Sequence, residues 1–406
     1  MNILTINSFD CSLDLSGGVN RTTYILTRNF RDNLHYKCFM GFYSNVPESY
    51  RLADFEGRIL LNRNFDRKKF RDFLVDNEID IVQVNFLKKE NLGTMRDIYE
   101  ISKSLNVKVI FAFHMCPGFQ SVTYGSWGMV QFCLFNSSLR RTVDELKKYM
   151  LTLARPLLSG VYDKLLRHKY LMPYESCDQV VVLSKNYVRP YMRIAGVKDD
   201  FKFINIPNAL TFDVFASEED ICKKKKQVIV VARFDEDTKR ISYSLRCWRR
   251  IEKTLGFEDW EFILVGQGRD MDYYRFLVKK WNLQRVVFTG VQKPLEYYRK
   301  ASIFLMTSTA EGWPMVMAES IQMGVVPVAF DSFASVHDIV KDGYNGYIVP
   351  NEDEDAMYEK VISLMGNDEQ RSTMAKNAVS YSRQFELPNI VERWRSLFET
   401  LVPSSK

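Results

Sequence analysis

The sequence has few histidines and no paired cysteine motif. Only 4 of its 406 residues are His, and none of its 7 Cys residues forms a C-x-x-C motif with another. An odd, scattered set of thiols does not build a disulfide framework, and a structural zinc site requires clustered Cys or His ligands. We therefore expect neither kind of site, and we expect a reducing compartment such as the cytoplasm.

Long apolar runs and a strong charge imbalance are absent as well. No run approaches the roughly 18 apolar residues that cross a bilayer. The opening residues, MNILTINSFD, lack the basic start and long apolar segment of a secretory signal and are expected to form a first β-strand. The net charge is only +6, from 56 Lys and Arg against 50 Asp and Glu. A membrane span, secretion and a nucleic-acid partner are therefore not expected.

The chain does contain an alternation of short apolar runs and longer amphipathic stretches. Runs such as VIVVA (228–232) and FILVG (262–266) are typical of strands buried on both faces of a parallel sheet. We predict an α/β fold with two doubly wound parallel-sheet domains. The predicted strands are 2–7, 37–42, 79–85, 107–113, 179–183, 227–232, 261–265, 286–289, 303–306 and 325–329, and the predicted helices include 20–32, 241–254, 271–281, 314–323 and 355–365.

The boundary between the two domains is expected between residues 208 and 226, where the apolar periodicity is weak. This stretch ends in four consecutive lysines, 223–226. A lysine run can be the solvated end of a linker or an anion site, and we favour the linker.

The region 124–175 interrupts the alternation. It joins an aromatic segment, YGSWGMVQFCLF, to a basic stretch whose apolar residues recur at helical spacing. Such a helix can lie on an anionic membrane surface, or it can pack its apolar stripe on a core and leave its basic residues in water. We favour the core-packed helix.

The segment 308–330 carries the strongest indication of a binding site. A polar loop follows the strand 303–306, and Pro314 is expected at the first helical position, which favours proline. The amides of Met315, Val316 and Met317 would then point outward from a helix N-terminus at the carboxyl edge of a parallel sheet. Phosphate groups bind at such helix ends.

Two glutamates flank this helix start. Glu311 precedes it, and Glu319 lies about 7.5 Å further along the axis than Pro314, on the side opposite Met317 and Ile321. The two carboxylates can contact groups at the two ends of a bound diphosphate. They can also be ordinary surface glutamates, which are favourable near any helix N-terminus.

This segment resembles the signature of retaining glycosyltransferases of family 4 (group 1 type), which have the GT-B fold. That fold consists of two Rossmann-like, doubly wound parallel-sheet domains facing across a cleft. The signature residues here are Glu311, Gly312, Trp313, Pro314, Glu319, Gly324, Pro327 and Val328.

Other segments resemble the same family in the same order. They include SGGVNR with Gly17 and Gly18, FAFHMCPG with His114, VVVLSKNYV with Ser184, INIPNAL, VVARFDEDTKR with Arg233 and Lys239, ILVGQGRD with Gly266, VVFTGVQ and DGYNGYIVP. The resemblance implies an acceptor-side domain at 1–207 with a helical insertion at about 124–175. It also implies a nucleotide-sugar-binding domain at 208–385 and a helix at 386–406 that crosses back to the first domain.

The resemblance also implies roles for these residues. Arg233 and Lys239 would hold the donor diphosphate, Glu319 the ribose, Glu311 the donor sugar, and His114 the sugar or the acceptor. The remaining donor contacts would come from Gly17, Gly18, Gly266, Trp313, Pro314, Met315 and Val316. No metal or other cofactor is expected, because the cations and the helix end already oppose the leaving diphosphate.

The implied reaction moves a sugar from a nucleotide-diphosphate sugar to a hydroxyl of a glycan or lipid-linked saccharide, with retained anomeric configuration. UDP is the default nucleotide of the donor, and GDP is the second choice. The implied role is bacterial surface polysaccharide biosynthesis in the cytoplasm, with the membrane inner leaflet as a possible surface. The alternatives are a non-catalytic nucleotide-sugar or polysaccharide binder of GT-B fold, and a GT-B epimerase or phosphorylase.

Two departures from the family pattern stand out. The usual Lys-Gly pair is Lys239-Arg240, so the loop lacks the conformational freedom of glycine. The usual G-G-x-x-E segment is replaced by residues 332–338, SFASVHD.

Overall fold

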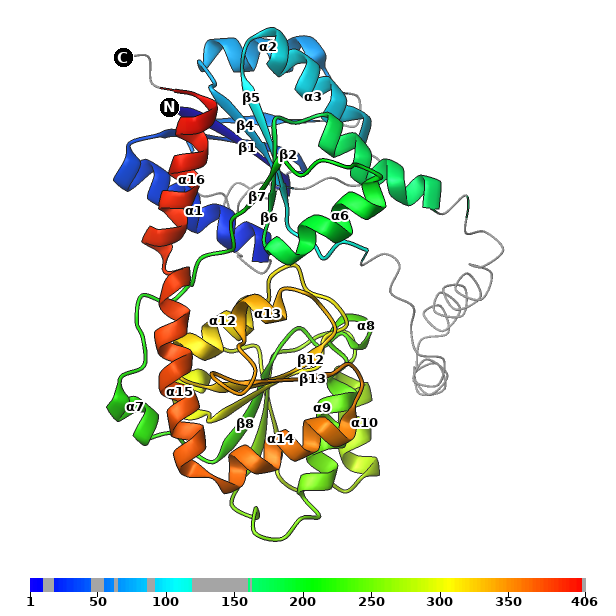
Figure 1. The fold of residues 1–406 in the computed structure, drawn as a ribbon, viewed down its shortest axis with the longest axis vertical. Helices are drawn as coiled ribbons and strands as arrows, with labels where there is room; N and C mark the ends of the chain where they lie inside the picture. Colours follow the sequence, from blue (N-terminus) through cyan, green and yellow to red (C-terminus); the bar gives the residue numbers. More distant parts are fainter. Residues whose placement is uncertain are drawn as a thin grey trace. The chain divides into compact units, whose positions relative to one another are not determined.

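The computed structural model describes residues 1–9, 18–44, 55–61, 65–85, 92–118, 160 and 163–403 (Figure 1). These residues form two compact units. Unit 1 comprises Met1–Gly118, Gly160–Thr211 and Phe385–Lys406, and the described part of unit 2 is Phe212–Gln384. Gly17 and most of the region 124–175 lie outside the described residues.

Unit 1 is built on a parallel sheet of seven strands in the order β3-β2-β1-β4-β5-β6-β7. Its register pairs Ile3 of β1 with Cys38 of β2 and Ile81 of β4. The strands are β1 (Asn2–Phe9), β2 (Lys37–Ser44), β3 (Gly57–Leu60), β4 (Ile81–Val84), β5 (Lys108–Phe113), β6 (Gln179–Val182) and β7 (Phe203–Asn205). The covering helices include α1 (Gly18–Leu34), α2 (Arg67–Asp76), α3 (Leu92–Ser104), residues 163–175, α6 (Val188–Ala195) and α16 (Leu387–Leu401).

The C-terminal helix α16 completes the core of unit 1. Trp394, Leu397 and Phe398 are buried in the same apolar cluster as Ile3 and Phe30. The rings of Phe30 and Phe398 meet edge to face with centroids 5.4 Å apart. The chain therefore returns to its first unit after forming the second.

Unit 2 is built on a parallel sheet of six strands in the order β10-β9-β8-β11-β12-β13. The strands are β8 (Gln227–Val231), β9 (Glu261–Val265), β10 (Val286–Gly290), β11 (Ile303–Met306), β12 (Val326–Asp331) and β13 (Tyr347–Pro350). The helices are α7 (Glu218–Cys222), α8 (Glu236–Lys239), α9 (Ile241–Ile251), α10 (Met271–Lys280), α11 (Pro294–Lys300), α12 (Met315–Gln322), α13 (Val336–Ile339), α14 (Glu354–Gly366) and α15 (Asp368–Ser382).

All ten predicted strands are present, and three further strands are not among the predictions. The additional strands β3, β7 and β13 are three or four residues long, and each is the outermost strand of its sheet. Such short, partly buried strands show no long apolar run in the sequence. The fourth edge strand, β10, contains the apolar run VVF and was predicted, although none of its residues is buried.

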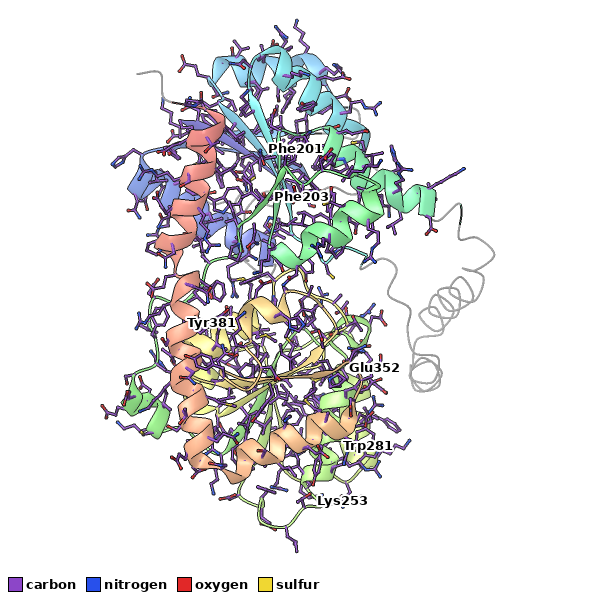
Figure 2. All side chains as sticks on the ribbon, viewed as in Figure 1. Phe201, Phe203, Lys253, Trp281, Glu352 and Tyr381 are labelled. Atoms are coloured by element: carbon purple, nitrogen blue, oxygen red, sulfur yellow. The ribbon has the colours of Figure 1, made fainter. Side chains whose placement is uncertain are left out.

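Residues 163–175 show how the last part of the basic region packs. Leu166, Tyr170 and Met172 are buried in unit 1, so this part of the helix packs on a core, but Leu165 of the expected apolar stripe is 51% exposed. Phe203 of β7 stacks on Tyr174 with ring centroids 5.7 Å apart, whereas Phe201 is 70% exposed (Figure 2). Across the described ranges, no helix is both long enough and apolar enough to cross a membrane.

Side chains of the lysine run before β8 contact other residues of unit 2. Lys224 Nζ donates to the carbonyl of Tyr298 at 2.7 Å, and burial lowers the pKa of this lysine to about 7. The ammonium groups of Lys223 and Lys226 pair with Glu219 and Asp259. Three of the four ammonium groups of the lysine run therefore already have partners, which does not favour an anion site.

Candidate functional site in unit 2

The strands β8 and β11 bring two polar loops together at one edge of the unit 2 sheet. The strands are neighbours, with Ile303 paired to Val228, so the loops that follow them are adjacent. The amide of Thr309 donates to the carbonyl of Thr238 at 2.9 Å and joins the two loops directly. This is the carboxyl edge of a parallel sheet, where ligands bind in open α/β folds.

Lys239 and Glu311 meet where these loops join. Lys239 Nζ lies 2.5 Å from Glu311 Oε1, and the two side chains are 21% and 14% exposed. The residues are separated by 72 positions in the chain, and both were predicted to belong to the site. The pair holds one cation in place at a largely buried position.

Arg233 differs from Lys239 in its surroundings. Its side chain is 70% exposed, and its nearest acid is Asp235, at 3.5 Å. Asp235 also accepts from Arg269 at 2.7 Å, and Arg269 pairs with Asp237 too. Because Arg269 balances these carboxylates, the guanidinium of Arg233 can still contact an anion from solvent.

The N-terminus of α12 differs in one respect from the prediction. Pro314 is the N-cap residue, with φ −76° and ψ 88°, and not the first helical residue. The amide of Met317 donates to the carbonyl of Pro314 at 3.0 Å, so the expectation that it points outward is wrong. Helix geometry leaves only the amides of Met315 and Val316 at this end without intrahelical acceptors.

Glu319 is buried within α12. It is 1% exposed, and Met317 and Ile321 on the opposite side of the helix are fully buried as well. The alternative of an ordinary surface glutamate therefore does not hold for Glu319. Trp313, at 6% exposure, is also buried. The contacts of Glu319 and Trp313 with a donor stay predictions.

Gly266 and Gly268 follow β9 and pack against the loop after β8. A Cβ atom at Gly266, whose φ is +133°, would lie 1.9 Å from the carbonyl oxygen of Ala232. A Cβ atom at Gly268 would lie 2.3 Å from the carbonyl oxygen of Phe234. The structure thus gives these glycines a packing reason, and donor contact by Gly266 stays a prediction.

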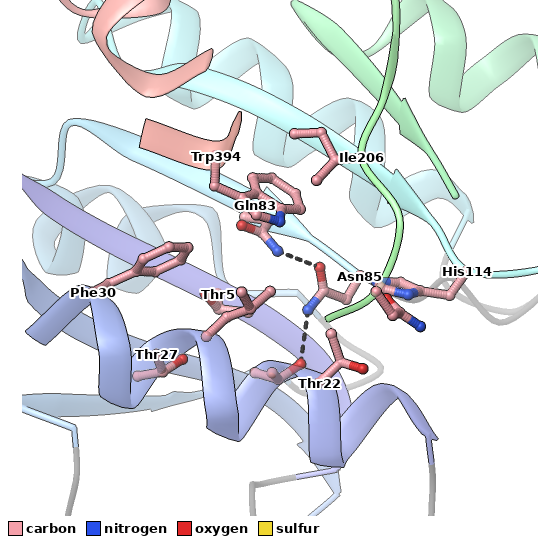
Figure 3. A pocket seen from close by; sticks show the side chains of 12 residues that line it. Thr5, Thr22, Thr27, Phe30, Gln83, Asn85, His114, Ile206 and Trp394 are labelled. Atoms are coloured by element: carbon pink, nitrogen blue, oxygen red, sulfur yellow. Dashed lines mark hydrogen bonds between the residues drawn. The ribbon is translucent and has the colours of Figure 1, made fainter. Parts of the chain in front are cut away.

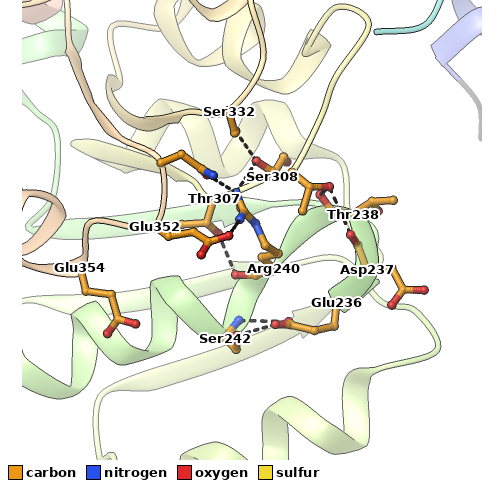
Figure 4. A network of polar contacts seen from close by, with 12 residues as sticks. Glu236, Asp237, Thr238, Arg240, Ser242, Thr307, Ser308, Ser332, Glu352 and Glu354 are labelled. Carbon is orange, nitrogen blue, oxygen red and sulfur yellow. Dashed lines mark hydrogen bonds and ion pairs between the residues drawn. The ribbon is translucent and has the colours of Figure 1, made fainter. Parts of the chain in front are cut away.

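Glu236 is a buried acid beneath the same loop. Its carboxylate accepts hydrogen bonds from the amide and the hydroxyl of Ser242 (Figure 4). Burial raises the pKa of this carboxyl to about 7, although the hydrogen bonds from Ser242 lower it in part. Glu236 is therefore at most partly ionised near neutral pH.

Two of the predicted site residues that the structure describes, Gly18 and His114, belong to unit 1, and His114 lines a small cavity. Gly18 is the exposed first residue of α1, and His114 directly follows β5. Both ring nitrogens of His114 are buried and find no hydrogen-bond partner among the described residues. Burial lowers the pKa of this histidine to about 4, so the ring is neutral at pH 7.

The cavity that His114 lines has both polar and apolar walls (Figure 3). Gln83 donates to Asn85 at 2.7 Å, and Asn85 donates to Thr23 at 3.0 Å. The volume of the cavity is about 10 Å³, which is close to the space that one water molecule needs. The lining residues are Thr5, Thr22, Thr23, Leu26, Thr27, Phe30, Gln83, Asn85, His114, Ile206, Asn208 and Trp394.

Most of the predicted site residues lie in unit 2. Unit 2 holds Arg233, Lys239, Gly266, Glu311, Trp313, Pro314, Met315, Val316 and Glu319, and the structure directly pairs Lys239 with Glu311. The sequence analysis did not identify Asp235, Arg269 or the role of Arg240. The only signal at Arg240 was the missing glycine. In the part of the chain that the structure describes, no three or more His, Cys, Asp or Glu residues are arranged to hold a metal ion.

A family model and curated relatives match part of the chain. Residues 212–380 match the model described as "Glycosyl transferases group 1". An alpha-1,4-N-acetyl-D-galactosaminyltransferase of Campylobacter jejuni, named for a diNAcBac-PP-undecaprenol-linked substrate, is 25% identical over 58% of this chain and 63% of its own length. The amylovoran biosynthesis glycosyltransferase AmsD of Erwinia amylovora is 26% identical over 55% of this chain and 63% of its own length. The matched segments thus span less than two thirds of these relatives.

Solved structures match the whole chain at low identity. A structure of HepE from Anabaena in complex with UDP aligns over 98% of this chain and all of its own, with TM-score 0.72 and 14% identity. The apo lipopolysaccharide outer core galactosyltransferase WaaB aligns over 98% of this chain and 99% of its own, with TM-score 0.67 and 14% identity. Together with the two parallel sheets, these likenesses confirm the predicted GT-B fold class.

Proposed function

We propose that the protein is a glycosyltransferase that moves a sugar from a nucleotide-diphosphate sugar to a hydroxyl acceptor. The observation that carries the proposal is the Lys239–Glu311 pair at the carboxyl edge of the unit 2 sheet. The pair brings a cation, of the kind that binds phosphate, next to a carboxylate, of the kind that binds sugar hydroxyls, within the segment that matches the group 1 model.

The proposed catalysis rests on charge stabilisation. As the bond between the sugar and the diphosphate breaks, negative charge grows on the leaving phosphate. Lys239, Arg233 and the free amides at the start of α12 would oppose this charge more strongly in the transition state than in the ground state. Arg233 can hold two phosphate oxygens at once, whereas Lys239 supplies a point charge.

Glu311 has two tasks in this proposal. Before the donor binds, its carboxylate holds Lys239 in place. With the donor bound, it would contact the sugar. The proposed reaction retains the anomeric configuration, by attack from the face of the leaving group, and requires no metal ion. His114, which is neutral at pH 7, would contact the sugar or the acceptor as a hydrogen-bonding group and not as a cation.

The proposed donor is a UDP-sugar, and the proposed acceptor is a glycan or lipid-linked saccharide of a bacterial surface polysaccharide. The donor is supported by UDP in the HepE structure, and the acceptor by the undecaprenol-linked substrate in the name of the Campylobacter relative. We also propose that the protein works in the cytoplasm, at the inner membrane surface. If it does not bind vesicles with anionic lipids at low salt, the membrane part of the proposal is wrong.

Thermal unfolding with UDP, GDP, ADP and CMP, each without added metal, tests the donor site. A ligand that binds only the folded protein at a hundredfold excess over Kd stabilises it by about 2.7 kcal/mol. We expect one diphosphate to raise the Tm of the wild type and to raise it less in Glu319→Gln. Glu359→Gln, on the exposed face of α14, is the matched control. If none of the nucleotides shifts the Tm, the proposed donor site is wrong.

Glu311→Gln separates an enzyme from a nucleotide-binding protein. The amide keeps the shape of the side chain but loses the charge that the sugar and Lys239 contact. We expect sugar transfer to fall at least about a hundredfold, and by a larger factor than the affinity for the diphosphate. If the wild-type protein binds a diphosphate but transfers no sugar, the result favours the alternative of a non-catalytic binding protein. Product analysis would distinguish transfer from epimerisation or phosphorolysis.

A further inference from the structure

Arg240 occupies a position where the family resemblance leads us to expect glycine. Its φ of 46° and ψ of 43° are in the left-handed region, which costs a residue with a Cβ atom about 1 kcal/mol or more. The residue is nevertheless 8% exposed and lies between α8 and α9. The backbone conformation of the missing glycine is thus kept, and a long cationic side chain is added to it.

The guanidinium of Arg240 joins three segments of unit 2 (Figure 4). Nε donates to the carbonyl of Thr307 at 2.8 Å, and Nη2 donates to the carbonyl of Ser308 at 3.0 Å. Nη2 also donates to Asn351 Oδ1 at 2.7 Å, and Nη1 donates to Glu352 Oε1 at 2.8 Å. We call Arg240 with these four partners the Arg240 latch.

The loop after β11 returns hydrogen bonds to the loop that carries Lys239. The hydroxyl of Thr307 lies 3.1 Å from the carbonyl oxygen of Lys239 and 3.0 Å from that of Arg240. On the other side, Ser332 Oγ donates to the same Ser308 carbonyl that accepts from Arg240, at 2.5 Å. The latch therefore also ties in the start of the segment that replaces G-G-x-x-E.

The helix before the latch is too short to fix Lys239 by itself. The helix α8 has four residues, and such short helices are unstable without tertiary contacts. Lys239 is the last of these residues, and Glu311 lies four positions after Thr307. Fixing residues 239–240 against residues 307–308 therefore sets the distance between the cation and the carboxylate.

We propose that Arg240 is a positioning residue that holds Lys239 beside Glu311 for contact with the donor diphosphate. This inference rests on the function proposed above. An ordered cation stabilises developing charge without reorganising at the moment of reaction, whereas a mobile lysine must first lose its rotational freedom. Arg240 itself touches no donor atom in this proposal.

The test compares nucleoside diphosphate and monophosphate affinity, measured by calorimetry, in wild type and Arg240→Gly. The variant keeps the left-handed backbone and removes the latch. We expect UDP to bind about tenfold more weakly and UMP to bind within about twofold of wild type, because in this proposal Lys239 contacts the phosphate that UMP lacks. GDP and GMP are measured in parallel, so that the choice of base does not decide the result.

Two variants control for general destabilisation and for charge. Arg250→Gly removes an arginine of α9 that pairs with Asp355, and is expected to lower both affinities equally or not at all. Arg240→Lys keeps the charge but cannot reach all four acceptors, and should fall between wild type and Arg240→Gly. If Arg240→Gly does not fold, Thr307→Val removes the returned hydroxyl contacts and carries the same expectation.

The outcomes separate the two proposals. A wild type that binds both diphosphates no better than the monophosphates contradicts the proposed donor site, and the role of Arg240 falls with it. A wild type that prefers a diphosphate, with an unchanged preference in the latch variants, overturns the role of Arg240 alone. A purely structural arginine would lower the affinity for both ligands by the same factor.

Discussion

At the scale of single residues, the buried carboxyl of Glu236 makes the stability of unit 2 depend on pH. The pKa is about 7 in the folded protein and 4.5 in a free glutamate. Between these values the folded chain binds a proton that the unfolded chain does not, so the free energy of unfolding falls as pH rises.

We therefore expect Glu236→Gln to stabilise the protein more at pH 8 than at pH 5, by up to about 3 kcal/mol. Urea unfolding of the variant and wild type at both pH values measures this difference. Glu359→Gln, an exposed glutamate of α14, should show no such trend. An equal effect of Glu236→Gln at both pH values would contradict the assignment of a raised pKa.

His114 gives a pH dependence of opposite sign. Its pKa is about 4 in the folded protein and 6.5 in a free histidine, because burial disfavours the imidazolium. Stability from this residue is complete above pH 6.5 and is lost as pH falls toward 4. His114→Asn removes this titration, so we expect its effect on the urea midpoint to become less unfavourable between pH 7 and pH 5. His168→Asn, at an exposed histidine, is the control.

Single residues differ in how far the sequence predicts them. The roles expected of the glutamates, Arg233 and Lys239 follow from the family resemblance. Arg240 was noted only as a departure, because its four acceptors include two backbone carbonyls and lie up to 112 positions away in the chain. Contacts of a side chain with distant backbone atoms leave no pattern in a single sequence.

At the scale of elements, the turn after β9 depends on the close approach of Gly266 to the loop after β8. We expect Gly266→Ala to destabilise the protein by at least about 3 kcal/mol, because the new Cβ atom would lie 1.9 Å from the Ala232 carbonyl oxygen. Gly256→Ala is the matched control. Its φ of +92° gives a similar backbone strain, but no atom lies within 4 Å of the added Cβ.

Urea denaturation of both glycine variants measures the difference. The control should lose about 1 kcal/mol from backbone strain alone. Equal losses in the two variants would mean that the contact with Ala232 relaxes at little cost. A loss of sugar transfer in Gly266→Ala would in any case not identify Gly266 as a donor-binding residue, since the fold of the loop changes with it.

The central strands were predictable from their almost complete burial. Central strands such as β8 and β9 have four buried residues out of five, and their aliphatic runs define them clearly. The N-terminus of α12 was predicted one residue early, because proline is favourable at both the cap and the first turn. Only the ψ of 88° at Pro314 distinguishes the two positions.

At the scale of the whole molecule, α16 makes the first unit depend on the last part of the chain. Phe398 is fully buried against Phe30. We expect Phe398→Ala to lower the stability of unit 1 by about 3 to 5 kcal/mol. Calorimetry should then show the unfolding transition of unit 1 at a lower temperature, with the transition of unit 2 unchanged. Glu399→Ala, which breaks an exposed pair with Arg395, should change little.

The position of α16 in the chain also reverses the order in which the two cores can be completed during synthesis. A ribosome adds roughly 5 to 20 residues per second, and a domain can fold only when all of its segments have emerged. Unit 2 has all of its segments once Gln384 has been made, whereas unit 1, which starts at Met1, also waits for Leu387–Leu401. Until α16 has been synthesised, the apolar surface that it covers is accessible to chaperones. The unit whose synthesis starts first is therefore the last to be completed.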